Sequence, residues 1–546
     1  MNKKILGVFV CILLIVPTVF LATGELNNTK TKDVIKNEGI TSLVYSFPPP
    51  ISVNMVLEES ICRRMSVRTF TNESVTDQEL STILWAAYGY TENGNRSIFS
   101  SDGTYSTIIY VIRSDATYKY VPETHSLSLF KSGNYLDLGE YTAPIKFGLV
   151  WDKSITADEK KGMAEIGMMG QNIYFDANAL DLATVTTGMN VEDLTQLGIP
   201  SNEKPEIIMP LGHPSSPYNF TYTPLPMSNL PVISNTTFSL ADSINKRQIV
   251  TMWDNTPLSM SEQSQLIWSS YGSSYFMDNV NHKRHRTLPS AINKYPFKIF
   301  AANQSGVYQY SPSTHSLTPI VQGDVREDIK ESLDVSDIMV TSAPWIIIPC
   351  LDTNIGQSTY EQFWYYEVGA IIHTVFLEAA ALNLGANVIT GISDENGLRS
   401  ALGISSQTNL VPWAVIPVGR SSSDNRPAIP DLSGPGSGNV GTLYDYTMST
   451  TDPDGDDVYY WIDWGDNTNS GWIGSYASGE TITVNHTWSK KGSYDIKVKA
   501  KDVYGAESDW ATLQVTMPRT ISFILLMKFL ERFPHAFILR NHILSL

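Results

Sequence analysis

The chain has 546 residues, a formal net charge of −17 and a sequence pI near 5.0. This length exceeds what one hydrophobic core organises, so about three domains are expected. The acidic balance argues against nucleic-acid partners, because it would repel phosphates. Apart from one cysteine in the N-terminal apolar run, the sequence contains only Cys62 and Cys350, which fall in different halves and exclude a disulfide framework.

The N-terminal segment, residues 1–24, has the layout of a secretory signal. Lys3 and Lys4 precede an apolar run from Ile5 to Ala22, and polar residues follow it. This pattern predicts export, with the segment either removed or retained as an anchor. The protein is therefore expected outside the cell or at the cell surface.

The central sequence is duplicated. Tyr118–Leu127 (YKYVPETHSL) recurs 190 positions later as Tyr308–Leu317 (YQYSPSTHSL). A spacing of this size makes each unit a whole domain and not a solenoid repeat. We therefore predict two tandem domains, at residues 45–220 and 232–422.

Helices and strands alternate in each unit, and the same elements recur. Helices are predicted to start near Leu57 and Leu240, to end at Gly89 and Gly272 after a tryptophan-containing stretch, and to start at Glu165 and Glu367. Continuous apolar runs predict buried strands at Ile145–Trp151 and Trp345–Pro349. This order indicates an α+β fold in which helices cover a central sheet.

A basic motif, Arg63-Arg64-Met65-Ser66-Val67-Arg68, ends the first predicted helix. The stretch resembles the nitroreductase family, and more closely its SagB-type dehydrogenase branch, in which an Arg-Arg-x-Ser-x-Arg signature holds flavin mononucleotide (FMN). Guanidinium forks and a hydroxyl suit a phosphate and the polar edge of a flavin ring. The resemblance implies that Arg64, Met65, Ser66 and Arg68 bind FMN. The alternative is a basic helix end that only complements the helix dipole.

The second unit has lost this motif but retains another. Its matching stretch has Ile249 and Thr251 in place of Ser66 and Arg68, so that only Arg247 remains of the anion-binding set. In contrast, Pro289, Ser290 and Ala291 resemble the family's Pro-Ser-Ala-Gly loop, which faces the flavin of the neighbouring subunit. Ile292 stands where glycine is usual, and the first unit has Phe99-Ser100-Ser101-Asp102 instead.

Members of the resembled family are homodimers with two flavins at the shared interface. The resemblance therefore implies a monomer whose two domains form an intramolecular pseudo-dimer. One composite pocket would join the arginine motif to the loop at 289–291 and hold one FMN, whereas the other would join Asp102 to Thr251 and be inactive. The basic residue that many relatives place after the final strand is His213 in the first unit and Arg420 in the second.

The chemistry would belong to the cofactor, because flavins transfer hydride while the protein positions them. The sequence identifies no nucleophile, metal cluster or acid–base pair, so catalytic residues, substrate and electron donor stay unassigned. His125 and His315, in repeated turns, are interpreted as structural. The competing hypothesis is a non-catalytic surface protein that uses degenerate domains as a binding scaffold.

The C-terminal part changes character after a Pro- and Gly-rich linker at 423–439. Short alternating strands at 440–517 predict a β-sandwich. The motifs DPDGD, DWGD and HTW resemble PKD domains, which are all-β and immunoglobulin-like, and Trp464 and Trp488 are expected in its core. The carboxylates of Asp452, Asp454 and Asp456 suit either Ca²⁺ or a solvated turn. Residues 518–546 are interpreted as an interfacial membrane anchor or a partly disordered tail.

Overall fold

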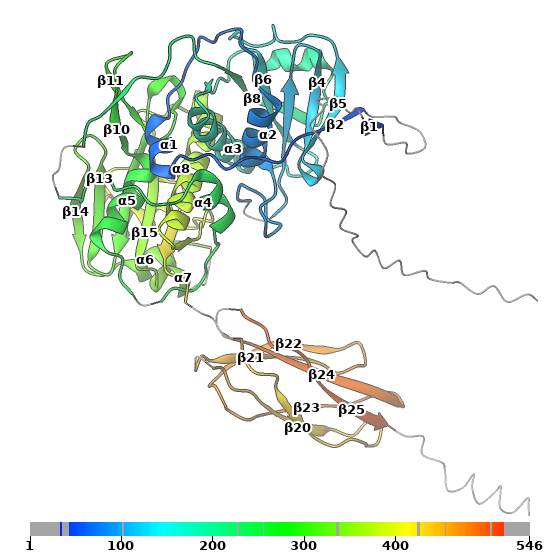
Figure 1. Ribbon diagram of the computed structural model, residues 1–546. Helices are drawn as coiled ribbons and strands as arrows, with labels where there is room; N and C mark the ends of the chain where they lie inside the picture. The colour runs from blue at the N-terminus through cyan, green and yellow to red at the C-terminus, as the bar shows by residue number, and fades with distance from the viewer. Residues whose placement is uncertain are drawn as a thin grey trace, which may run out of the picture.

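The computed structural model consists of two α+β halves followed by a β-sandwich, which is the predicted fold class (Figure 1). It describes the two-residue strand Asp33–Val34 and residues 43–517, apart from 101–102, 226–228, 255, 335–337, 423–425, 454 and 503–504. The predictions for the N-terminal segment, the C-terminal tail, Asp102 and Asp454 lie outside the described residues.

Both halves contain the same antiparallel sheet. In the first, the spatial order of strands is β1 (Asp33–Val34), β2 (Leu43–Ser46), β5 (Ser126–Ser132), β4 (Ala116–Val121), β3 (Thr107–Ile112), β6 (Ile145–Asp152), β8 (Glu203–Gly212), β7 (Ala183–Thr184). In the second, it is β14 (Ser316–Gln322), β13 (Gly306–Ser311), β12 (Phe297–Asn303), β15 (Trp345–Asp352), β18 (Ile416–Gly419), β16 (Gly385–Ala386), with β17 (Leu410–Pro412) paired to β15. The apolar runs predicted as strands are β6 and β15, and both lie inside their sheets. Both faces of these strands are covered, which explains why their apolar runs are continuous.

Three helices correspond between the halves. In the first half they are α1 (Leu57–Arg63), α2 (Asp77–Tyr88) and α3 (Glu159–Ala179), and in the second they are α4 (Leu240–Lys246), α5 (Met260–Tyr271) and α8 (Glu361–Ala381). The second half also contains α6 (Arg326–Glu331), α7 (Ile338–Thr341) and α9 (Glu395–Ala401). The 3-10 helices are η1 (Pro122–Thr124), η2 (Val191–Leu197), η3 (Ala291–Asn293) and η4 (Ser358–Tyr360). Capping boxes at Thr76 and Ser259 start α2 and α5, and Gly89 and Gly272 end them as predicted.

The long helices α3 and α8 begin earlier than the sequence indicated. The predicted starts were Glu165 and Glu367, but the helices begin at Glu159 and Glu361. The first turn of α8 contains the aromatic residues Phe363 and Trp364, so an apolar signal was present there and the prediction overlooked it. The first turn of α3 is polar, for example at Lys160, and therefore carries none of the apolar periodicity on which the prediction depended. In α3 the side chain of Asp158 caps the exposed amides of this turn.

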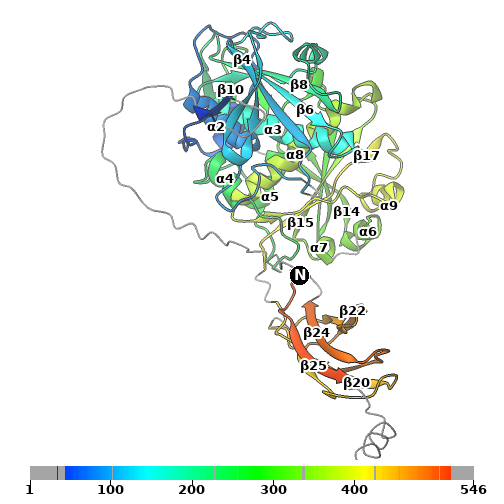
Figure 2. The ribbon, with the colours of Figure 1, turned by 90° about the vertical axis from the view of Figure 1, so that its right-hand side faces the viewer.

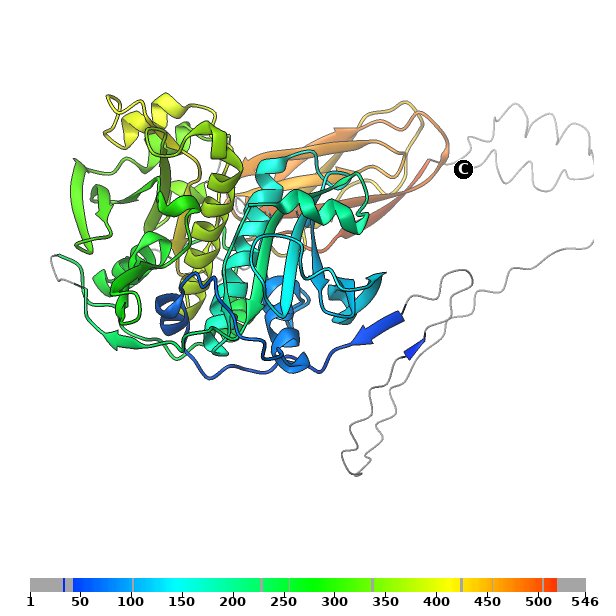
Figure 3. The same ribbon diagram turned by 90° about the horizontal axis from the view of Figure 1, so that it is seen from above.

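Helices α3 and α8 pack against each other at the centre of the molecule (Figure 3). A Cβ atom on Gly167 would lie 2.1 Å from the carbonyl oxygen of Tyr366, and one on Gly369 would lie 2.1 Å from that of Ala164. Since Gly167 and Gly369 are equivalent in the duplication, the halves are related as two subunits of a dimer would be. One continuous hydrophobic core joins them, including Ile166 and Ile372.

A further small sheet lies beside the second half and has no equivalent among the described residues of the first. Its strands, in order, are β11 (Lys283–Arg286), β10 (Ser273–Asp278) and β9 (Phe220–Tyr222). The last of these belongs to the segment that connects the two halves. The β10–β11 hairpin follows α5 directly and leads into the loop at 289–291.

The C-terminal domain is a sandwich of two antiparallel sheets, set apart from the two halves (Figure 2). The first sheet contains β19 (Asp431–Ser433), β20 (Tyr444–Ser449) and β23 (Ile482–His486), and the second contains β22 (Asn469–Tyr476), β21 (Val458–Asp463), β24 (Gly492–Asp502) and β25 (Ala511–Met517). Trp464 and Trp488 lie in its core as expected. Within the described ranges, no helix combines the length and apolar character needed to cross a membrane.

Candidate active site

Both halves line one cavity of about 1030 Å³, called the main cavity below. Its lining includes six of the seven residues predicted from the sequence: Arg64, Ser66, Arg68, Pro289, Ser290 and Ala291. The seventh, Met65, is only 8% exposed and is not part of the lining. Residues more than 220 positions apart therefore share one wall. The end of α1 contacts the end of β11 there, through the hydrogen bond from Arg64 to the carbonyl of Arg286.

The two arginines of the motif differ in their freedom. Arg64 is 2% exposed, its Nε donates to the carbonyl of Arg286 at 3.0 Å, and its guanidinium lies over the ring of Tyr174. Its Nη1 is buried without a hydrogen-bond partner. Arg68 is exposed and makes only a 3.5 Å contact with the carbonyl of Ser66. A buried unpaired donor beside a free guanidinium suits a phosphate, so these residues fit FMN.

Ser66 belongs to a polar network on the wall of the main cavity. Its Oγ lies 3.0 Å from the hydroxyl of Tyr174, which also accepts the backbone N–H of Thr186 at 2.8 Å. The hydroxyl of Thr186 lies in turn 3.0 Å from that of Tyr366. This network connects the end of α1 to α3 and α8, and it holds Ser66 in place at the cavity.

Ser290 uses its hydroxyl within the protein. The hydroxyl donates to Glu367 at 2.6 Å, and Tyr271 donates to the same carboxyl at 2.5 Å. Burial raises the pKa of Glu367 to about 8. The two hydrogen bonds to this carboxyl hold the loop at Ser290 in position.

The loop at the mouth of the main cavity has a strained backbone. Ile292, the residue that replaces the usual glycine, has φ +46°, and Asn293 and Tyr295 have φ +58° and +48°. A β-branched residue is disfavoured in this left-handed region, because its Cβ approaches the following carbonyl. Ile292 is also 63% exposed, so little burial compensates for the strain.

Replacing Ile292 with glycine should therefore stabilise the protein by about 1 kcal/mol, since it removes the steric cost of the left-handed conformation. Chemical denaturation of both proteins would measure the difference in the free energy of unfolding. Ile155 is a suitable control, because it is 47% exposed and does not have positive φ. Its replacement with glycine should stabilise nothing, and equal gains at both positions would contradict the strain argument.

Sequence reasoning missed the basic strand β11. Lys283, Arg284 and Arg286 all line the main cavity. The signal was present as four successive basic residues, Lys283-Arg284-His285-Arg286, just before the loop at 289–291. Only the arrangement of the hairpin brings them to the same cavity as the arginines of α1.

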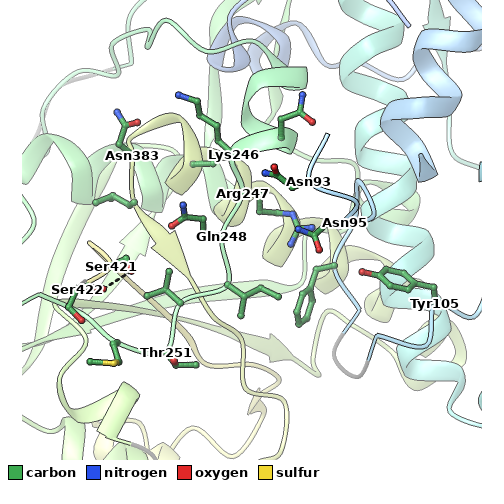
Figure 4. A pocket seen from close by; sticks show the side chains of 17 residues that line it. Asn93, Asn95, Tyr105, Lys246, Arg247, Gln248, Thr251, Asn383, Ser421 and Ser422 are labelled. Atoms are coloured by element: carbon green, nitrogen blue, oxygen red, sulfur yellow. Dashed lines mark hydrogen bonds between the residues drawn. The ribbon is translucent and has the colours of Figure 1, made fainter. Parts of the chain in front are cut away.

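The equivalent site on the opposite side of the central helices is divided. One hollow of about 800 Å³ contains Lys246, Arg247 and Thr251 (Figure 4), and a second of about 500 Å³ lies beside the start of α3. Phe99 lines both. Its ring stacks on Phe376 at 5.6 Å between ring centres, in the places that correspond to Pro289 and Tyr174 of the main cavity.

Two arginines on the opposite side of the central helices contact protein atoms. The Nη2 of Arg247 donates to the carbonyls of Arg96 and Ile98, at 3.1 and 3.2 Å. Arg420 is paired with Glu262. Both guanidinium groups therefore hold protein atoms, although the Nε of Arg247 and the Nη1 of Arg420 are buried without a hydrogen-bond partner.

The remaining histidines of the sequence analysis lie outside the main cavity. His213 is 3.9 Å from Glu73 and does not line the cavity. His125 has φ +45°, and its ring nitrogens bond Tyr120 and Ser81, which fastens β4 and β5 to α2. His315 makes the same two contacts with a tyrosine of β13 and a serine of α5. These contacts account for both as structural residues.

Comparison with known proteins identifies this class of fold. The model of the nitroreductase family matches residues 61–213 and 244–420, and that of the PKD domain matches 432–515. A Methanocaldococcus jannaschii protein described as a nitroreductase is 32% identical over 178 residues, covering 29% of this chain and 90% of that protein. The chain therefore belongs to the nitroreductase family, in two copies, and carries a PKD domain.

One solved structure shares the fold of the two halves. A crystal structure from Anabaena variabilis, described as a nitroreductase, aligns with a TM-score of 0.51 and 17% identity over 64% of this chain and 90% of its own. Because 64% exceeds the share of either half, this alignment spans both. The PKD domain of an M14-like peptidase from a Thermoplasmatales archaeon is 52% identical and covers 18% of this chain and 100% of its own, with a TM-score of 0.18.

Proposed function

We propose that this protein is an exported, SagB-type FMN-dependent oxidoreductase that holds one flavin per chain in the main cavity. The observation that carries the proposal is the meeting of Arg64, Ser66 and Arg68 with Pro289, Ser290 and Ala291 in one cavity. The arginines would hold the phosphate, and the flavin would supply hydride transfer when bound. The protein supplies the anion site and the ordered wall of the cavity.

Membership of the nitroreductase family supports the redox chemistry. Export is supported by the signal-like N-terminal sequence and by the PKD domain, which is typical of extracellular and surface proteins. The limit of one flavin is supported by Phe99 and its stacking on Phe376, by the carbonyl contacts of Arg247, and by Thr251 in place of Arg68.

Flavin stoichiometry tests the proposal. The protein purified from cells, or reconstituted with FMN, should show flavin absorbance that corresponds to one FMN per chain. Two bound flavins would refute the single composite site. A colourless protein that cannot be reconstituted would refute the enzyme and support the scaffold hypothesis.

A further inference from the structure

The main cavity contains more positive charge than one flavin can neutralise. Its lining includes the basic side chains Arg64, Arg68, Lys283, Arg284 and Arg286, and it includes no Asp or Glu among the residues that the structure describes. None of these basic groups forms an ion pair within the described part of the chain. This concentration of cations occurs in a protein of net charge −17.

The partners of the cations on β11 are neutral. Arg284 donates to two carbonyls at 2.6 and 2.7 Å, and Arg286 donates to two others at 2.5 and 2.9 Å. The side chain of Lys283 is exposed, and it forms no hydrogen bond or ion pair with any other residue that the structure describes. Carbonyls fix the position of a guanidinium but leave its charge uncompensated, and partly buried cations are costly without a counter-ion.

A flavin phosphate accounts for only part of this charge. A phosphate monoester carries about −1.5 to −2 at neutral pH, so roughly three of the five positive charges stay unbalanced. The volume of about 1030 Å³ is at the upper end of the roughly 300–1,000 Å³ usual for ligand pockets. The cavity thus has both charge and room for a second ligand.

The basic hairpin is specific to this side of the molecule. Gly272 and Arg286 are separated by 14 positions, whereas the equivalent Gly89 and Arg96 are separated by 7. In the first half the shorter connection brings Asn93 and Asn95 to the opposite site, with no added cation (Figure 4). The hairpin is held by pairing with β9, so it forms a fixed wall of the cavity.

We propose that the main cavity binds, beside the flavin, an anionic small molecule that bears a carboxylate or phosphate group, and that Lys283 and Arg284 recognise this group. The inference rests on the proposed function, and it assigns the substrate class of the same site. Either a carboxylate or a phosphate can supply the anionic group of this ligand.

Three probes of similar size and different charge test the inference. With the FMN-loaded protein, changes in flavin absorbance would measure the binding of 4-nitrobenzoate, 4-nitrophenyl phosphate and neutral 4-nitrobenzyl alcohol. At least one anion should bind about tenfold or more tightly than the alcohol, and the stronger of the two identifies the preferred group. The variant Lys283→Glu should remove this preference and leave the affinity for the alcohol unchanged.

The matched control is Lys246→Glu, which makes the same charge change in the opposite site and should leave the preference for anions intact. Equal binding of all three probes to the wild type would overturn the inference. A Lys283→Glu protein that keeps its preference for anions would also overturn it. The same holds if Lys283→Glu changes only the difference in affinity between FMN and riboflavin, because Lys283 would then contact the flavin phosphate and not a second ligand. If no flavin is retained, the proposed function fails, and calorimetry of the same probes on the flavin-free protein decides the inference separately.

Discussion

Replacing Arg68 with alanine should weaken FMN binding by about 10- to 100-fold, the loss expected for one charge-assisted hydrogen bond of about 1.5–3 kcal/mol. Arg68 is exposed and has one long contact in the protein, so its removal leaves no buried group unpaired. The loss should therefore reflect the missing contact with the phosphate. Titration of flavin-free protein with FMN, followed by flavin fluorescence, measures it.

The duplication provides a matched control for this variant. Thr251 occupies the position of Arg68 in the second half and lines the opposite site. Thr251→Ala should leave FMN binding unchanged. Riboflavin, which lacks the phosphate, should bind the wild type and Arg68→Ala alike. An equal loss with Thr251→Ala, or with riboflavin, would show that Arg68 does not hold the phosphate.

Replacing Gly369 with valine should destabilise the protein by about 3 kcal/mol, at the upper limit of the usual cost of overpacking. A Cβ at this position would lie 2.1 Å from a backbone oxygen of α3, which cannot rotate away as a side chain would. The helices would have to separate. Urea denaturation should show a lower midpoint, and FMN binding should weaken because both halves line the main cavity.

The sign of this effect excludes helix propensity as its cause. Alanine is favoured over glycine inside a helix by about 0.5–1 kcal/mol, so even Gly369→Ala would stabilise α8 if the helix were isolated. Gly198 is the control, because a Cβ there meets nothing within 4 Å and only its positive φ opposes the change. A Gly369→Val protein as stable as Gly198→Ala would contradict the close crossing of α3 and α8.

Much of the fold was predictable from the sequence because its signals are local. The buried strands β6 and β15 are continuous apolar runs, and Gly89 and Gly272 end their helices where predicted. The predicted starts of α3 and α8 were wrong by six residues. In α3 the polar first turn has no apolar period, whereas in α8 the aromatic residues Phe363 and Trp364 were overlooked. The duplication and the PKD motifs were visible as repeated or specific strings of residues.

The candidate site was also predictable only in part. The sequence by itself determined which residue types were available: an arginine motif in one half, a Pro-Ser-Ala loop in the other, and the loss of each in its counterpart. Only the tertiary structure decided that these two motifs share a cavity, that β11 adds cations to it, and that Phe99 divides the opposite site. The physical reason is that local patterns encode periodicity and turns. Contacts between segments more than 220 residues apart depend on how the two halves pack, and α3 and α8 pack closely at Gly167 and Gly369.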